Sequence, residues 1–189
     1  MKFQKQAAPR QASPGKTAAA AVAKSRKRVV VKWSLLAVAT GICVALCLWT
    51  THLAEQRLVI GEVHKILPFL SLQRSANSGV AFGLLGGRLP IILTANAVAI
   101  LVVLVYVFME RRAVLAGIAG GLVVGGSVGN VIQRLTGDGH VTDFIKFPYW
   151  PNFNLPDVFI VLGIVVVFMG LLVEAVLVFR AGRKTPASL

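Results

Sequence analysis

The sequence carries little charge, and acidic residues are the scarcest of all. There are seven Asp and Glu against twenty Lys and Arg, and charged residues make up only 14% of the chain. A soluble domain has about 25% charged residues. Here 56% of the residues are hydrophobic, and the mean hydropathy is +0.76. This composition excludes an ordinary soluble domain and indicates a membrane protein.

The excess of basic residues does not point to nucleic acid. The net charge is +13, but nine of the twenty Lys and Arg lie in the first 32 residues, which contain no Asp or Glu. Such a concentration at one end is typical of a basic tail rather than of a nucleic-acid-binding surface. We therefore expect no nucleic-acid partner.

Residues that build disulfides, metal sites and nucleophilic sites are also few. Cys43 and Cys47 are the two cysteines, and they lie four residues apart in an apolar segment, as small helix residues do in a membrane. The three histidines, His52, His64 and His140, are too scattered to form a zinc site. The chain has no complete G-x-x-x-x-G-K-S/T phosphate-binding loop and no Ser–Lys arrangement beyond chance. We expect neither a metal nor another cofactor.

What the chain has in abundance is long apolar runs. A bilayer core requires roughly 20 apolar residues in a helix. Four runs satisfy this requirement: residues 29–49, 89–109, 113–132 and 156–179. The first is too long for a signal peptide and has no A-x-A site, so we expect it to stay as a helix. Residues 1–28 and 183–189 are predicted to be cytoplasmic tails, the first of them disordered.

Basic residues near the span ends predict the orientation. The N-terminal region to Lys32, the turn at 110–112 and the C-terminal end contain nine, two and three Lys or Arg. With four spans all three segments lie on one side, so both termini are expected in the cytoplasm. The connections at 50–88 and 133–155 then face outward. Within the first of them, alternating residues near 70–79 predict one or two short strands on the outer membrane face.

The third run contains a row of glycines at four-residue spacing, at 117, 121, 125 and 129, with two more at 120 and 126. Such a face lets a neighbouring helix approach closely. Asn130 and Arg134 continue the row from Gly126 at the same spacing. Polar groups at membrane depth are costly and usually functional, so these two residues are candidates for a site.

Two aspartates stand in the predicted outer connection and at the start of the fourth run. Asp143 lies in "GHVTDFIKF" and Asp157 in "NFNLPDVFIVLG". Either Asp alone is explained as a helix cap or a surface charge. Two neighbouring carboxylates, by contrast, share one proton and provide an acid and a base together, as peptide hydrolysis without a metal or nucleophile requires. Asp157 follows Pro156 at a helix start, where the helix dipole favours its ionised form.

Four motifs in this order, "NSGVAFGLL", "GGSVGNVIQR", "GHVTDFI" and "FNLPDVFIVLG", resemble lipoprotein signal peptidase, or signal peptidase II. The similarity covers residues 30–180. It implies an all-α integral membrane protein of four transmembrane helices, with a small extracytoplasmic β-cradle between helices 1 and 2. It also implies a bacterial inner-membrane location with the active site at the outer face.

The resemblance further implies an aspartic endopeptidase that removes the signal peptide from a bacterial prolipoprotein. The cut falls before a Cys that carries a diacylglyceryl group. Asp143 and Asp157 match the catalytic pair. The implied site-lining residues are Asn77, Gly79, Asn130, Arg134 and Asn154. The expected partners are prolipoproteins and membrane lipid, and the expected state is a monomer.

The sequence departs from the family pattern at four positions. His52 and Gln56 stand where the family has Asp and Lys, Gln133 replaces an Asp, and Pro156 replaces an Ala. Because Gln133 cannot neutralise Arg134, we expect Arg134 to pair with one of the two aspartates. The departures keep open a non-catalytic or specialised paralogue that binds prolipoprotein or confers inhibitor resistance. A transporter or channel is disfavoured, since no internal repeat is present and the polar residues lie at the rim.

Overall fold

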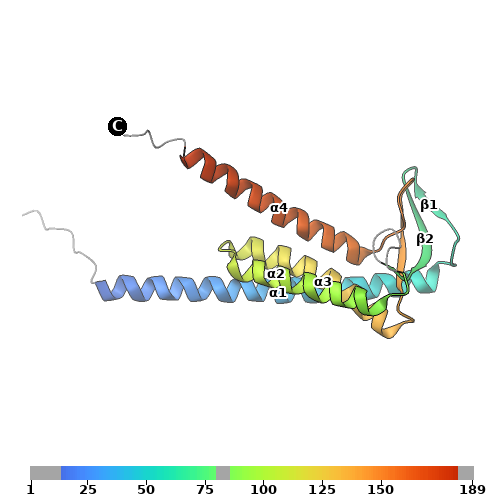
Figure 1. Ribbon diagram of the computed structural model, residues 1–189, viewed down its shortest axis with the longest axis horizontal. Coiled ribbons are helices and arrows are strands. Elements are labelled where there is room, and N and C mark those ends of the chain that lie inside the picture. Colours follow the sequence, from blue (N-terminus) through green and yellow to red (C-terminus); the bar gives the residue numbers. More distant parts are fainter. Residues whose placement is uncertain (1–13, 80–85, 183–189) are drawn as a thin grey trace, which may run out of the picture.

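The computed structural model describes residues 14–79 and 86–182. Its elements, in chain order, are α1 (Pro14–Arg57), β1 (His64–Leu67), β2 (Leu70–Asn77), α2 (Leu89–Met109), α3 (Ala113–Thr136), β3 (Val141–Lys146) and α4 (Leu155–Gly182). The strands lie together at one end of the helices, and the start of α1 and the end of α4 lie at the other (Figure 1). Within the described ranges, four helices are long and apolar enough to cross a membrane, which confirms the four predicted spans.

The first helix is longer than predicted. It contains 44 residues and begins at Pro14, so the prediction of disorder does not hold for residues 14–28. The segment between Thr17 and Ala23 is almost entirely alanine, the residue with the highest helix propensity, and Pro is well tolerated in a first helical turn. At about 1.5 Å per residue, α1 is about twice as long as a bilayer core is thick. Residues 1–13 and 183–189 of the two predicted tails lie outside the described residues.

Helix α3 is the centre of the bundle. It is mostly buried, whereas α1, α2 and α4 leave most of their surface free for lipid. Its predicted glycine row faces α1. A Cβ atom on Gly121 would lie 2.5 Å from Ala39 Cβ, and one on Gly125 would lie 2.5 Å from Cys43 Cβ. The neighbouring Gly126 faces α4 instead, where it lies against the Pro156 carbonyl. The glycines therefore allow α3 to approach two helices at the distance of backbone contact.

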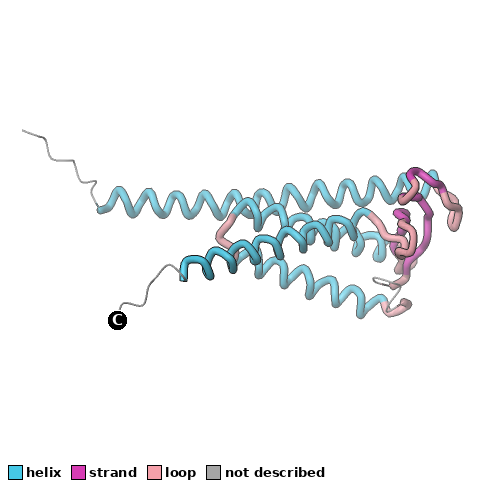
Figure 2. The backbone as a smooth tube through the Cα atoms, turned by 90° about the horizontal axis from the view of Figure 1, so that it is seen from above, coloured by secondary structure: helices cyan, strands magenta, loops and turns pink. Residues whose placement is uncertain are grey.

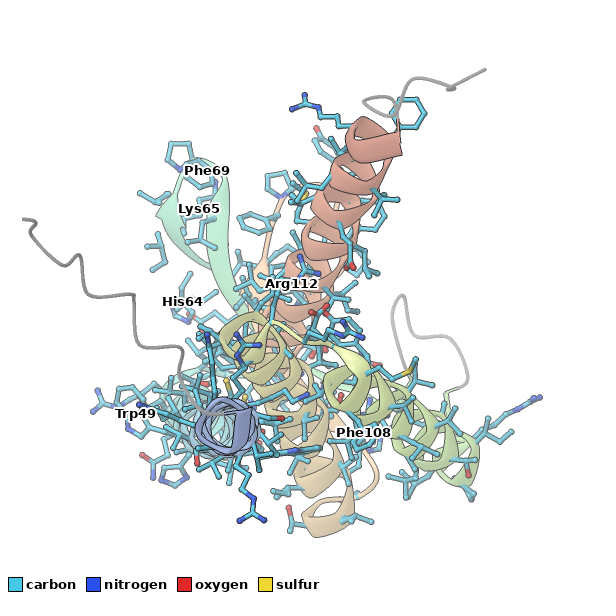
Figure 3. All side chains as sticks on the ribbon, turned by 90° about the vertical axis from the view of Figure 1, so that its left-hand side faces the viewer. Trp49, His64, Lys65, Phe69, Phe108 and Arg112 are labelled. Carbon is cyan, nitrogen blue, oxygen red and sulfur yellow. The ribbon has the colours of Figure 1, made fainter. Side chains whose placement is uncertain are left out.

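At the end of the bundle opposite the strands, the side chains of Lys32 and Arg112 form hydrogen bonds between helices. Lys32 of α1 donates to the carbonyl oxygens of Val107, Phe108 and Glu110, at 2.6, 3.1 and 2.9 Å. These carbonyls end α2 and have no partner within their own helix. Arg112, before α3, donates to the Gly170 carbonyl and to the Glu174 carboxylate, so it ties the α2–α3 turn to α4 (Figure 3).

The three strands form an antiparallel sheet in the order β1-β2-β3. Strands β1 and β2 confirm the prediction of strands after the first span. Strand β3 lies between α3 and α4 in the chain and was not predicted, so the sheet draws on both outer connections. It pairs with β2 in a register that sets Asp143 opposite Ser75 and Val141 opposite Asn77. Viewed from above, the sheet closes one end of the bundle (Figure 2).

Close packing of α3 against α1 makes a specific prediction. Substitution Gly121→Ala places a methyl group 2.5 Å from the Ala39 Cβ and 3.0 Å from the Leu36 carbonyl oxygen, and neither atom is at the end of a flexible side chain. We expect a loss of about 1–3 kcal/mol in stability, typical of an overpacked core. Thermal unfolding in detergent measures it.

The matched control is Gly41→Ala in α1, where no atom lies within 4 Å of the added methyl. This substitution should leave stability unchanged or raise it by up to about 1 kcal/mol, because alanine is the better helix former. Equal unfolding temperatures for the two variants would contradict the close α1–α3 contact.

Candidate active site

Asp143 lies on β3 with its carboxylate buried inside the protein. Only 2% of the residue is exposed. One carboxylate oxygen accepts a hydrogen bond from Asn77 Nδ2 of β2 at 2.9 Å, and the other accepts one from Asn154 Nδ2 at 2.8 Å. Asn77 reaches Asp143 because the β2–β3 register brings both onto one face of the sheet. The Asn77 side-chain oxygen also accepts from the Gly79 amide at 2.8 Å, which fixes the orientation of the Asn77 amide group.

Asp157 stands in the first turn of α4. Its carboxylate accepts from Asn130 Nδ2 of α3 at 2.9 Å and from the Asn154 amide at 3.3 Å. In return, Asn154 Oδ1 accepts from the Asp157 amide at 3.0 Å. This exchange between residues three apart is a capping box, which satisfies two free amides at the start of a helix. The fold of α4 thus fixes the position of the Asp157 carboxylate.

Asn154 joins the two carboxylates. It is fully buried, and its Nδ2 donates to Asp143 Oδ1 at 2.8 Å and to Asn130 Oδ1 at 3.1 Å. The same residue caps α4 through Asp157. One residue therefore holds a carboxylate from a strand and one from a helix, the first through its side-chain amide and the second through its backbone amide. Asn130 completes the connection from α3.

Arg134 lies beside this group. Its guanidinium donates to the Gly79 carbonyl at 2.7 Å and more weakly to the Asn130 carbonyl at 3.4 Å. The structure thus brings all seven predicted site residues together. However, no carboxylate of the described residues lies within 4.0 Å of Arg134, so the expected ion pair with Asp143 or Asp157 is absent. Backbone carbonyls take the place of that partner.

The positions that depart from the family pattern fall in different surroundings. His52 and Gln56 are exposed in the last two turns of α1. Pro156 is buried in the first turn of α4, where a proline does not interrupt the helix. Gln133 is buried and accepts from the Thr142 amide at 3.0 Å. Sequence reasoning missed this contact, because it depends on strand β3, and the residues Val141–Ile145 do not alternate between apolar and polar as a half-buried strand does.

Burial controls the acidity of Asp143. Loss of water raises the pKa of its carboxyl to about 7, and the negative charge of Asp157 adds to the rise. Hydrogen bonds from Asn77 and Asn154 and the positive charge of Arg134 act in the opposite direction. Near neutral pH, Asp143 therefore exists in both the protonated and the ionised form. Such a carboxyl can donate a proton as well as accept one.

Fold and site together define a multi-pass membrane protein with a pair of carboxylates at one end of its helices, Asp143 buried and Asp157 partly buried. The family model for signal peptidase (SPase) II matches residues 39–173. The chain belongs to the signal peptidase II family, whose members are peptidases.

Curated relatives agree with this assignment. The lipoprotein signal peptidase of Symbiobacterium thermophilum is 38% identical over 140 residues, covering 70% of this chain and 88% of the relative. That of Mesorhizobium japonicum is 36% identical over 141 residues, covering 69% and 81%.

Two solved structures of bacterial membrane enzymes share the fold. The first has a TM-score of 0.69 at 21% identity and covers 82% of this chain and 93% of its own. The second has a TM-score of 0.65 at 22% identity and covers 72% and 92%.

The raised pKa of Asp143 predicts how stability depends on pH. The folded-state pKa of about 7 lies above the ordinary value of 3.8, so the folded state binds this proton more tightly than the unfolded state. The resulting stabilisation is complete below about pH 4 and is lost as the pH rises through about 7. Substitution Asp143→Asn should remove this slope from the unfolding temperature measured across that range.

The control is Asp138→Asn, which removes an exposed carboxyl from the turn after α3 and should keep the native slope. Parallel curves for the native protein and Asp143→Asn would show that Asp143 does not retain a proton on folding.

Proposed function

We propose that the chain is an aspartic endopeptidase that removes signal peptides from diacylglyceryl-modified bacterial prolipoproteins and cuts before the lipidated Cys. The observation that carries this proposal is the joining of Asp143 and Asp157 through Asn154 in a member of a peptidase family. Curated relatives carry the name lipoprotein signal peptidase, which supports the substrate class.

The two carboxylates have different surroundings, which assigns them different roles. Asp143 has a pKa raised to about 7 and supplies the proton. Asp157 lies at the start of α4, where the helix dipole and the hydrogen bonds from Asn130 and the Asn154 amide partly stabilise a negative charge. Asp157 is therefore the base that activates water, and Asp143 is the acid that polarises the peptide carbonyl.

In the proposed reaction, water attacks the carbonyl carbon while Asp157 takes one of its protons. Asp143 donates its proton to the carbonyl oxygen, so a neutral tetrahedral intermediate forms. The C–N bond then breaks as Asp157 gives its proton to the leaving nitrogen and Asp143 recovers its own. The products are a signal peptide with a free carboxyl group and a lipidated Cys with a free amine. Asn154 keeps both carboxyl groups oriented throughout.

A single chain supplies every residue that this reaction requires. The catalytic pair and the five lining residues all come from one copy, which supports a monomeric enzyme. The partners are then a prolipoprotein and the surrounding lipid. No step needs a cofactor.

The first test is the loss of activity in Asp143→Asn and Asp157→Asn. Each substitution keeps the size of the side chain but removes a group that accepts or donates a proton. We expect each to reduce cleavage of a diacylated prolipoprotein at least about a thousandfold, since the pair acts as a unit. The assay uses the purified protein and follows release of the signal peptide.

The exposed Asp138→Asn is the control and should cleave at the native rate. Native-rate cleavage by either dyad variant would refute the aspartic mechanism. If the native protein binds prolipoprotein without cutting it, the alternative of a non-catalytic or resistance paralogue is favoured. The departures from the family pattern at His52, Gln56, Gln133 and Pro156 are the features that keep this alternative under test.

We place both termini in the cytoplasm and the carboxylate pair at the outer face of the bacterial inner membrane. The start of α1, the α2–α3 turn and the end of α4 lie at one end of the bundle, and the sheet lies at the other (Figure 1; Figure 2). Basic residues concentrate in the first group, as cytoplasmic segments do. A prolipoprotein reaches its peptidase from the membrane, so a site at this boundary suits the substrate.

Thiol labelling of intact cells tests the orientation. A cysteine introduced as Ser78→Cys should react with a membrane-impermeant reagent, and Ala187→Cys should not. The native protein is the control, because Cys43 and Cys47 are buried against α3 and should stay unlabelled. Reaction at position 187 alone would mean the reverse orientation, with the carboxylate pair on the cytoplasmic side.

A further inference from the structure

Thr142, the residue before Asp143, is bound to two helices at once. Its backbone amide donates to Gln133 Oε1 of α3 at 3.0 Å. Its hydroxyl donates to Glu55 Oε1 of α1 at 2.6 Å. The strand that carries Asp143 is therefore fixed to α3 and α1 at the position next to the carboxylate. None of these three residues touches Asp143 through its side chain in the described hydrogen bonds.

The need for these contacts follows from the place of β3 in the sheet. It is an edge strand, and β2 covers only one of its sides. Amides on the other side of an edge strand lack a partner strand. Gln133 supplies an acceptor for the Thr142 amide, and Phe153 pairs with Ile145 farther along the same strand. Asp143 lies between these two attachment points, so its backbone is restrained on both sides.

The side-chain nitrogen of Gln133, Nε2, is the other polar atom of this residue. Gln133 Nε2 and Thr51 Oγ1 are both buried, and neither has a hydrogen-bond partner within the described residues. Along the α1–α3 interface, Cys43 lies against Gly125 and Cys47 against Gly129. The next residues at the same spacing are Thr51 and Gln133. Continuing this spacing, we infer that the two side chains face the same part of the interface, where a bridging water would satisfy both atoms.

We propose that Gln133, together with Thr142 and Glu55, forms a clamp that positions Asp143 against Asp157. Gln133 acts here as a positioning residue, since it reaches the carboxylate only through the strand. Its amide oxygen accepts the Thr142 N–H without adding a negative charge beside the two carboxylates. An Asp at this position would add such a charge. The clamp thus gives a structural role to a residue that departs from the family pattern.

This inference rests on the proposed function for its kinetic consequences. Charged groups that face Asp143 are Asp157 from α4 and Arg134 from α3, while Glu55 from α1 reaches the neighbouring Thr142. A loosened β3 leaves these charges in place but admits water to Asp143. Hydration lowers a pKa that burial has raised. The alkaline limb of the activity profile, which requires protonated Asp143, then moves to lower pH.

The test compares Gln133→Met, which keeps the shape but removes the acceptor, with Thr142→Val and Thr142→Ser. When a partly buried amide loses its acceptor, the equilibrium constant for local opening rises about five- to hundredfold. We therefore expect Gln133→Met to speed hydrogen exchange of the Thr142 amide about tenfold or more. Both Gln133→Met and Thr142→Val should lower kcat about tenfold or more, leave KM within about twofold and shift the alkaline limb downward.

Two variants serve as controls. Thr142→Ser keeps the hydroxyl and should restore native kcat and the native pH limb. Thr136→Val makes the same chemical change at an exposed site, where the hydroxyl donates to its own helix at Ile132, and should match the native protein. Unfolding temperatures identify any variant that has lost its fold.

The clamp proposal would be overturned if Gln133→Met had the kcat, the alkaline pH limb and the Thr142 amide exchange rate of the native protein. So would a fall in kcat with an unmoved pH limb and native exchange at Thr142, because that pattern indicates general destabilisation. If Asp143→Asn itself still cleaves, the proposed function fails instead, and the exchange measurement decides the clamp without reference to activity.

Discussion

Close approach of α3 to its neighbours is the constraint on which the other features depend. Glycine at four-residue intervals removes the side chains that would keep α1 away, and Gly126 does the same toward the start of α4. In lipid, where apolar side chains gain little by leaving the solvent, such backbone contact is a main source of helix association. The same contact brings Asn130 of α3 within 2.9 Å of the Asp157 carboxylate. Packing and site assembly are thus consequences of one helix face.

The site combines this rigid helix pair with a small sheet. A strand alone would hold Asp143 loosely, because β3 is an edge strand and its sheet has only three members. Asn154 connects it to the cap of α4, and Thr142 connects it to α1 and α3. Amide groups make all the hydrogen bonds to the two carboxylates among the described residues, and the nearest further acidic group in this network, Glu55, binds the Thr142 hydroxyl rather than the pair. These neutral partners orient the two carboxylates without adding a charge beside them.

The sequence predicted the parts of the structure that depend on short stretches of the chain, namely the apolar spans and the motif residues. Hydropathy located the four spans, and the motifs identified seven residues that the structure brings together. It did not reach features set by tertiary contact. The Arg134 guanidinium binds backbone carbonyls, which no side-chain pattern records. Strand β3 is short, and its pairing with β2 joins residues far apart in the chain. The helical start of α1 has no apolar periodicity, and only its run of alanines, the best helix formers, indicates a helix there.

Lys32 has a consequence for how the helices can move. Its ammonium group has three protons, and three carbonyls at the end of α2 accept them. A slide of α1 by one residue would displace this group by about 1.5 Å and a slide by one turn by about 5.4 Å. Either movement leaves a charge without acceptors at the edge of the hydrocarbon, where such charges are costly. The three hydrogen bonds of Lys32 therefore resist a slide of α1 along α2 but leave the two helices free to tilt about this point.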